Sequence, residues 1–145
     1  MSAPVINEIT RTEAWLYQTL ATNAAITAIV GTRIYAGAMP PEVDAYPALV
    51  FQWIAAMDDR TTLGPARTWA ASRYLVKGIC EGRSALPLQP LMDAVDRALF
   101  GASGGAPNAA ITYCRGIRPF RLTTYENNHY FQQVGREWEI AVSAQ

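Results

Sequence analysis

A nearly unbroken apolar stretch from Ala45 to Met57 is the feature that most constrains how this chain can fold. In an extended strand, successive side chains point to opposite faces. One face would carry Leu49, Phe51, Trp53 and Met57, and the other would carry Val50 and Ile54. Because neither face is polar, both faces should be covered. Helices from 145 residues can plausibly cover one of them, so we expect a neighbouring chain to cover part of the other.

The composition indicates one globular domain with no bulk charge. A chain of 145 residues is long enough for a substantial core, and its 12 basic residues balance its 12 acidic residues. This balance argues against a nucleic-acid binder that works by overall positive charge. Lys77 is the single lysine beside eleven arginines. Arginine favours interfaces, although a GC-rich genome would explain the bias equally well.

The two cysteines and the N-terminal residues exclude several classes of protein. Cys80 and Cys114 are too few for a disulfide framework or a zinc site, so we expect two reduced thiols in the core. The N-terminal residues lack a basic segment followed by an apolar run, and no uncharged stretch approaches the length of a membrane span. We therefore expect a soluble protein made in a cytoplasm, with no membrane partner.

The order of periodic segments predicts a single α+β domain over residues 1–145, with residues 1–8 as a loose N-terminal arm. The expected helices are one capped by Thr10 and Glu13, a short one capped by Thr22 or Asn23 and ended by Gly31, and one from Ser84 to Gly101. The expected strands lie at residues 33–35, 45–57, 68–80, 111–117, 118–125 and 130–142. Residues 111–117 and 118–125 could instead form one bent strand. Asn127 and Asn128 tolerate the turn between the last two strands. This order favours a mainly antiparallel sheet with the helices packed on one face.

Two further expectations concern the C-terminal half. Residues 101–108 are rich in glycine and read as a flexible loop. The strand at 130–142 alternates clearly, with Val134, Trp138, Ile140 and Val142 on one side and Gln133, Glu137 and Glu139 on the other. We therefore expect the glutamate side of this strand to face water.

No group of residues has the pattern of a catalytic, metal or cofactor site. His129 lies in a predicted turn without a nucleophile or carboxylate beside it in the sequence. Asp58 and Asp59 are adjacent in a polar hairpin loop that extends to Arg67, and one acidic pair is a poor metal site. We therefore predict no enzyme activity, no metal and no cofactor.

Three arginines near the C-terminus form the nearest approach to a nucleic-acid patch. Arg115, Arg118 and Arg121 alternate with aromatic residues, but their spacing does not require Arg118 to share a face with the other two. The pattern is open to three interpretations, namely a DNA-facing patch, a set of ion pairs between subunits, or solubility of a strand edge.

Several segments resemble one known family. The segments are the Trp15–Leu20 helix, Gly31-Thr32-Arg33-Ile34-Tyr35, Pro40, and Tyr46-Pro47-Ala48-Leu49-Val50-Phe51-Gln52, followed by a strand and helix from Tyr74 to Leu99 and a hairpin from Tyr125 to Ile140. This layout, over residues 13–142, resembles the tail-terminator, or tail-completion, proteins of long-tailed bacteriophages. The resemblance implies an α+β virion subunit that forms a six-fold ring. Such a ring caps the tail tube, stops its elongation, and joins the tail to the head connector while DNA passes through the hole.

The resemblance implies four partners: other copies of the chain, the tail-tube protein, the head-closure or connector protein, and the passing DNA. It also implies a place in the virion, at the head-proximal end of the tail. Candidate contacts with a neighbouring subunit or the tube are Trp53, Asp58, Asp59, Arg60, Leu63, Arg67 and Arg73, and Arg115, Arg118 and Arg121 are candidates for the DNA lumen or an interface. The alternatives are a head-closure protein, a small ligand-binding α+β domain, and a nucleic-acid-binding module.

Overall fold

The structure, a computed structural model, describes residues 8–41, 45–56, 69–106 and 109–144. The helices are α1 (Glu8–Ala21), α2 (Ala24–Val30), the 3-10 turn η1 (Leu86–Leu88) and α3 (Gln89–Leu99). The strands are β1 (Ile34–Ala36), β2 (Ala48–Ala56), β3 (Trp69–Glu81), β4 (Gly104–Ala106), β5 (Ala109–Glu126) and β6 (His129–Ala144).

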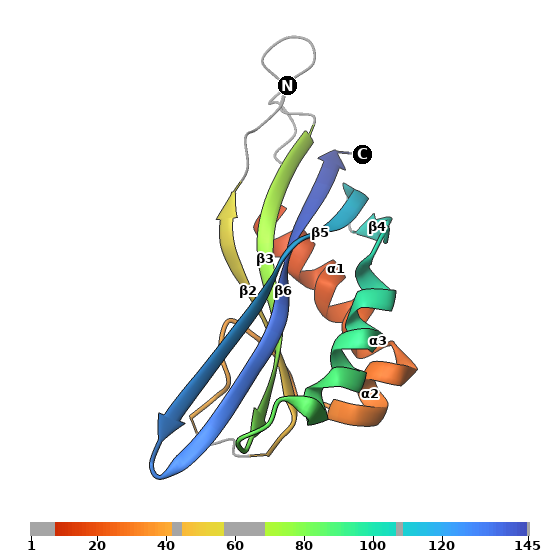
Figure 1. Ribbon diagram of the computed structural model, residues 1–145. Helices are drawn as coiled ribbons and strands as arrows, with labels where there is room; N and C mark the ends of the chain where they lie inside the picture. The colour runs from red at the N-terminus through yellow and green to blue at the C-terminus, as the bar shows by residue number, and fades with distance from the viewer. Residues whose placement is uncertain (1–7, 42–44, 57–68, 107–108, 145) are drawn as a thin grey trace.

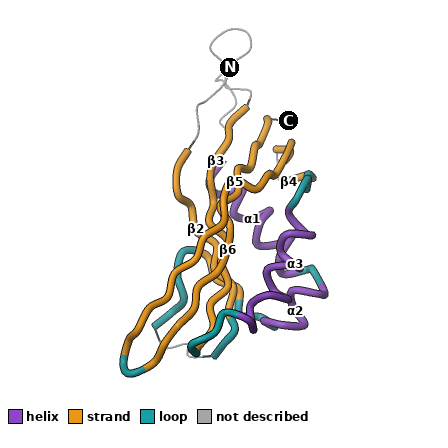
Figure 2. Tube along the Cα trace, viewed as in Figure 1, coloured by secondary structure: helices purple, strands orange, loops and turns teal. Residues whose placement is uncertain are grey.

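The strands form one six-stranded sheet in the order β1-β2-β3-β6-β5-β4. β1 runs parallel to β2, and every other pair is antiparallel. The three α-helices lie against one face of this sheet, and the long β5–β6 hairpin projects beyond them (Figures 1 and 2). The chain is therefore a single-domain α+β protein with a mainly antiparallel sheet, which confirms the predicted fold class.

The core lies between this face and the helices. On the strands it contains Leu49 and Phe51 of β2, Tyr74 and Val76 of β3, and Trp138 of β6, all almost completely buried. The helices contribute the buried side chains Leu16, Leu20, Ile26, Val30, Leu91, Val95 and Leu99. The prediction that one face of β2 and β3 packs on the helices is confirmed.

Short-range chemistry explains where several elements begin and end. The side chain of Asn23 accepts a hydrogen bond from the Ile26 N–H at the start of α2, as expected for one of the two candidate caps. Gly31, which has a φ of 60°, follows the last residue of α2. Asn127 and Asn128 have φ of 51° and 66° and form the tight turn between β5 and β6.

A close approach fixes the distance between α3 and the sheet. A Cβ atom added at Gly78 of β3 would lie 2.9 Å from Leu91 and 3.1 Å from Leu88. A larger residue at this position would push the helix outward, so the glycine permits the packing that the periodicity of α3 requires.

Four expectations about the elements were wrong. Thr10 and Glu8 lie inside α1, so Thr10 does not precede the helix and Glu8 does not belong to the arm. Residues 101–108 are not all loop, because Gly104–Ala106 pair with the start of β5 as the edge strand β4. Trp53 shares the helix-side face with Leu49 and Phe51, as predicted, and lies opposite the core residue Tyr74, but its side chain near the end of β2 is 42% exposed instead of covered.

Candidate functional site on the outer face of the sheet

The outer face, defined as the sheet face opposite the helices, carries two ion pairs between β5 and β6. Arg115 lies opposite Glu139, and Arg118 lies opposite Glu137. In each pair the guanidinium Nε donates a hydrogen bond to the carboxylate. The glutamate side chains are 4% and 9% exposed, whereas the arginine side chains are 64% and 67% exposed. The face therefore buries its acids and presents its arginines.

These burials correct the expectation that the glutamate side of β6 faces water. Alternation assigned Glu137 and Glu139 to the correct face, but both residues are buried there. A carboxylate is costly to remove from water unless a cation compensates it. The arginines of β5 supply that compensation, and Glu137 in turn raises the pKa of Arg118.

A bulge in β5 brings both arginines to the outer face. Arg118 comes three positions after Arg115, so a regular strand would place the two on opposite faces. The pairing shifts between Gly116 and Arg118, with Gly116 opposite Trp138 and Arg118 opposite Glu137. The extra residue therefore reverses the alternation, as β-bulges do.

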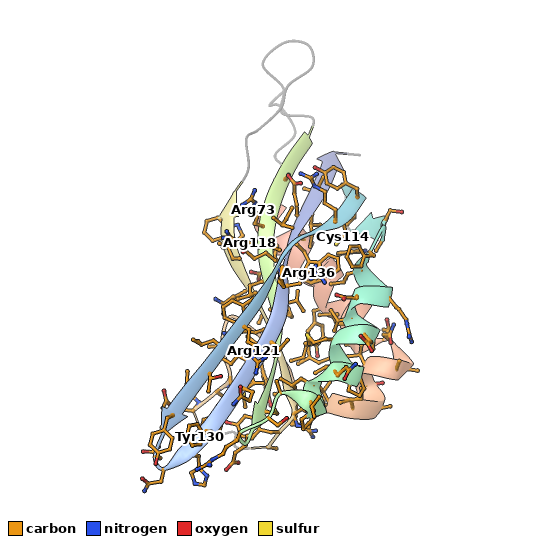
Figure 3. The ribbon with its side chains drawn as sticks, viewed as in Figure 1. Arg73, Cys114, Arg118, Arg121, Tyr130 and Arg136 are labelled. Atoms are coloured by element: carbon orange, nitrogen blue, oxygen red, sulfur yellow. The ribbon has the colours of Figure 1, made fainter. Side chains whose placement is uncertain are left out.

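A third arginine borders the same acids from β3. Arg73 lies directly opposite Glu139 on the side away from Arg115. Its Nε atom is buried, and within the described part of the chain that atom has no hydrogen-bond partner. Figure 3 labels Arg73 and Arg118, which lie near each other in the upper half of the sheet. The centre of the outer face therefore combines three arginines with two buried carboxylates.

The single lysine lies on this face as well. Lys77 of β3 donates a hydrogen bond of 2.8 Å to the side chain of Gln133, and its ammonium lies 5.6 Å from the centre of the Phe120 ring. Burial lowers the pKa of Lys77. Gly135 separates Lys77 from Phe120 in the sheet register and leaves room for this contact.

Apolar side chains surround the charged centre. Ala71 and Leu75 of β3 and Ala141 of β6 are at most 6% exposed on this face. At the end of β2, Ile54 is 39% exposed, while the neighbouring Trp53, opposite the core residue Tyr74, lies on the helix side of the sheet. The surface that this face exposes is therefore formed largely by arginine side chains, which are enriched in protein–protein interfaces.

Comparison with known proteins finds a similar fold but no similar sequence. No known family matches the sequence, and no curated protein matches it. The fold is similar to that of a solved chain described as "Virion of native gene transfer agent (GTA) particle". The TM-score is 0.76 at 18% sequence identity, and the alignment covers 94% of this chain and 99% of that chain. At this level of identity the similarity shows that the fold is shared.

The structure separates the predicted contact residues into three groups. Arg73, Arg115 and Arg118 meet on the outer face, and Trp53 lies at the exposed end of β2. Arg121 lies opposite Val134, a residue packed against the core, and therefore points to the helix side of the sheet. Asp58, Asp59, Arg60, Leu63 and Arg67 lie outside the described residues.

The other candidate groups are structural where they are described. Cys80 and Cys114 are buried free thiols, as expected, and burial raises the pKa of Cys114 to about 12. His129 lies in an exposed position at the end of the hairpin, 2.6 Å from a carboxylate oxygen of Glu81. Among the described residues, no three His, Cys, Asp or Glu side chains are grouped to hold a metal ion. The described helices are too short or too polar to cross a membrane.

Sequence reasoning did not identify Glu137 and Glu139 as partners of the arginines. The sequence shows that Glu137 and Glu139, two positions apart, share one face of β6. The bulge that brings Arg118 opposite Glu137 has no local sequence signal apart from Gly116. Lys77 and Gln133 were missed because their contact joins strands 56 residues apart in sequence.

Proposed function

We propose that this chain is a structural subunit of a phage-like virion, and that copies of it assemble into a ring at the head-proximal end of the tail. The observation that carries the proposal is the shared fold with a chain of the gene transfer agent virion, which extends over nearly the whole length of both chains. The resemblance of residues 13–142 to tail terminators supports the same role. The ring, of six copies, would cap the tail tube, stop its elongation and join the tail to the head connector.

The outer face supports assembly with further copies. A ring contact is heterologous, so one patch of a subunit meets a different patch of the next subunit. Arg115 and Arg118 on the outer face are largely exposed, and arginine is enriched in patches of this kind. We therefore assign Arg73, Arg115 and Arg118 to the contact between subunits. Arg121 points to the opposite face and cannot share that contact.

The polar loop after β2 is the second proposed contact. Its residues Asp58, Asp59, Arg60, Leu63 and Arg67 follow directly from the exposed end of β2. We propose that they reach an adjacent subunit or the tube, and that DNA passes through the ring without sequence-specific binding. Because Arg115 and Arg118 are already neutralised by glutamates, they would attract a phosphate backbone only weakly.

A tube-growth assay tests the proposed function. Tail-tube protein from the same phage-like particle would be polymerised with and without this chain, and tube lengths would be measured by electron microscopy. The proposal predicts that substoichiometric amounts of the chain arrest growth. Tubes that grow equally long in both conditions would contradict the capping role, and binding to the isolated connector alone would favour a head-closure protein.

A further inference from the structure

A groove lies on the helix side of the molecule, between α3 and the projecting β5–β6 hairpin. It consists of two hollows of about 430 and 350 Å³ that share Met92, Arg121 and Val134. We call this the hairpin groove. Its combined volume lies in the range that accommodates several side chains of a bound peptide. Figure 3 labels Arg121 and Tyr130 on the hairpin that forms one wall.

The floor of the hairpin groove is apolar. Met92 of α3 and Val134 of β6 are half-buried, and Leu88 beneath them is fully buried. At the rim, the side chain of Leu86 is 74% exposed. An apolar side chain inserted here would remove Leu86 and the floor from water together.

Two cations border this floor without an acidic partner. The third arginine at the groove, Arg136, has an acidic partner, because its Nε atom lies 3.4 Å from a carboxylate oxygen of Asp96. On the outer face, Arg115 and Arg118 are paired with glutamates. The guanidinium carbon of Arg83 lies 5.1 Å from the centre of the Tyr130 ring. Neither Arg83 nor Arg121 forms an ion pair with a described residue. Two acids, Asp93 and Asp96, lie on the α3 wall. The lining of the groove holds three arginines and two aspartates and therefore carries a net positive charge, opposite in sign to a carboxylate.

The edge of the sheet beside the groove is open. β4 pairs with β5 only at Ala109–Ile111, and from Arg115 onward the outer edge of β5 has no partner strand among the described residues. An extended segment could therefore hydrogen-bond to β5 while it inserts alternate side chains into the groove. Exposed aromatic residues, the pair Tyr125 and Tyr130 at 4.7 Å, extend this surface toward the hairpin tip.

We propose that the hairpin groove docks an extended, acidic peptide segment of a partner protein, with a bulky apolar side chain on Met92 and Val134 and carboxylates on Arg83 and Arg121. The argument for an acidic peptide is the charge of the groove. The apolar floor would accept many ligands, but the two unpaired arginines favour a peptide with aspartate or glutamate on either side of its apolar residue. The proposal does not depend on ring formation, because the groove lies on the opposite face of the sheet from the proposed subunit contact.

Peptide selection tests this proposal directly. A display library of random twelve-residue peptides would be selected on the immobilised full-length chain, and the enriched peptides would be synthesised and measured by fluorescence anisotropy. We expect enriched sequences with an apolar residue flanked by Asp or Glu. Arg83→Ala, Arg121→Ala and Leu86→Ala should each weaken their binding by about tenfold. All three side chains are exposed, so the fold should tolerate their loss.

Two matched variants serve as controls. Arg97→Ala removes an exposed arginine of α3 that does not line the groove, and Leu122→Ala removes an exposed leucine from the outer face. Both should bind the peptides as the unaltered chain does. The proposal is overturned if no peptide is enriched, if replacing the peptide acids with amides leaves affinity unchanged, or if Arg97→Ala weakens binding as much as Arg121→Ala.

Other occupants of the groove would give different results. If a second copy occupies it, Arg83→Ala and Arg121→Ala should shift the sedimentation of the chain itself toward smaller species, and no acidic peptide should be enriched. If nucleic acid occupies it, a labelled oligodeoxythymidine should bind and lose affinity in the same variants. Either result would replace the peptide proposal.

Discussion

Glu137 is buried on β6, and Arg118, directly opposite on β5, covers its carboxylate while two thirds of the arginine side chain stays exposed. Glu137 depends on Arg118 more than Arg118 depends on Glu137. The glutamate needs a positive charge to remain buried, whereas the arginine already has access to water. This asymmetry gives the first testable consequence of the structure.

Replacing Arg118 with alanine should lower the thermal midpoint of the chain, because Glu137 would then lie buried without a counter-charge. The double variant Arg118→Ala/Glu137→Leu should recover part of that loss, since it removes the buried charge as well. The midpoints would be measured by circular dichroism at constant salt. Additive losses in the double variant would show that the pair does not interact as the structure indicates.

Gly135 should not tolerate a side chain. A Cβ atom there would lie 2.2 Å from the Val76 carbonyl oxygen and 2.6 Å from the Lys77 Cα atom, so the β3 backbone would have to move. We expect Gly135→Ala to reduce the free energy of unfolding by on the order of 3 kcal/mol. Gly104→Ala, whose Cβ would approach only the Trp15 side chain at 3.3 Å, should cost less than about 1 kcal/mol in the same urea titration. Equal losses in the two variants would contradict the packing of β3 on β6.

Stability should fall at alkaline pH through the buried thiol of Cys114. Burial raises the pKa of Cys114 in the folded chain to about 12, whereas an unfolded thiol has a pKa of about 8.5. Above pH 8.5 the unfolded state therefore binds fewer protons than the folded state, and the free energy of unfolding decreases as pH rises toward 12.

The measurement for Cys114 is a pair of urea titrations at pH 7.5 and pH 10. The unaltered chain should lose on the order of 1–2 kcal/mol more between these pH values than Cys114→Ala. The comparison between variants removes the contributions of other groups that titrate in this range. The same pH dependence in both chains would show that Cys114 is not the source.

The loop after β2 is tested by shortening it. Deleting residues 61–65 from the polar loop should leave a folded protein with weakened rings, because the proposed loop contacts join adjacent copies. Circular dichroism would check the fold, and negative-stain imaging with tail tubes would count rings. Unaltered ring assembly by the deletion variant would contradict the assignment of the loop.

The elements that were predicted correctly are those with local chemical causes. The spacing of Leu88, Leu91 and Val95 predicts the buried face of α3, and Asn127 and Asn128 have the positive φ values that their turn requires. The apolar character of both faces of β2 also agrees with the structure: Leu49 is buried against the helices, and Val50 is buried on the other side.

The features that were missed depend on register. Arg118 follows a β-bulge, and a bulge reverses the alternation on which any assignment of faces rests. The buried state of Glu139 depends on strands that meet only in the folded sheet. The hairpin groove was also absent from the sequence reasoning, because α3 and the hairpin contribute its walls from segments far apart in the chain.

We propose that copies of this chain form a ring at one defined end of a phage-like tail. The most direct measurement is electron microscopy of purified, gold-labelled chain mixed with matching tail tubes. We expect ring-shaped caps at a single end of each tube, with gold at that end alone. Label distributed along the tubes or at both ends, or an unlabelled tube population with the chain free in solution, would contradict it.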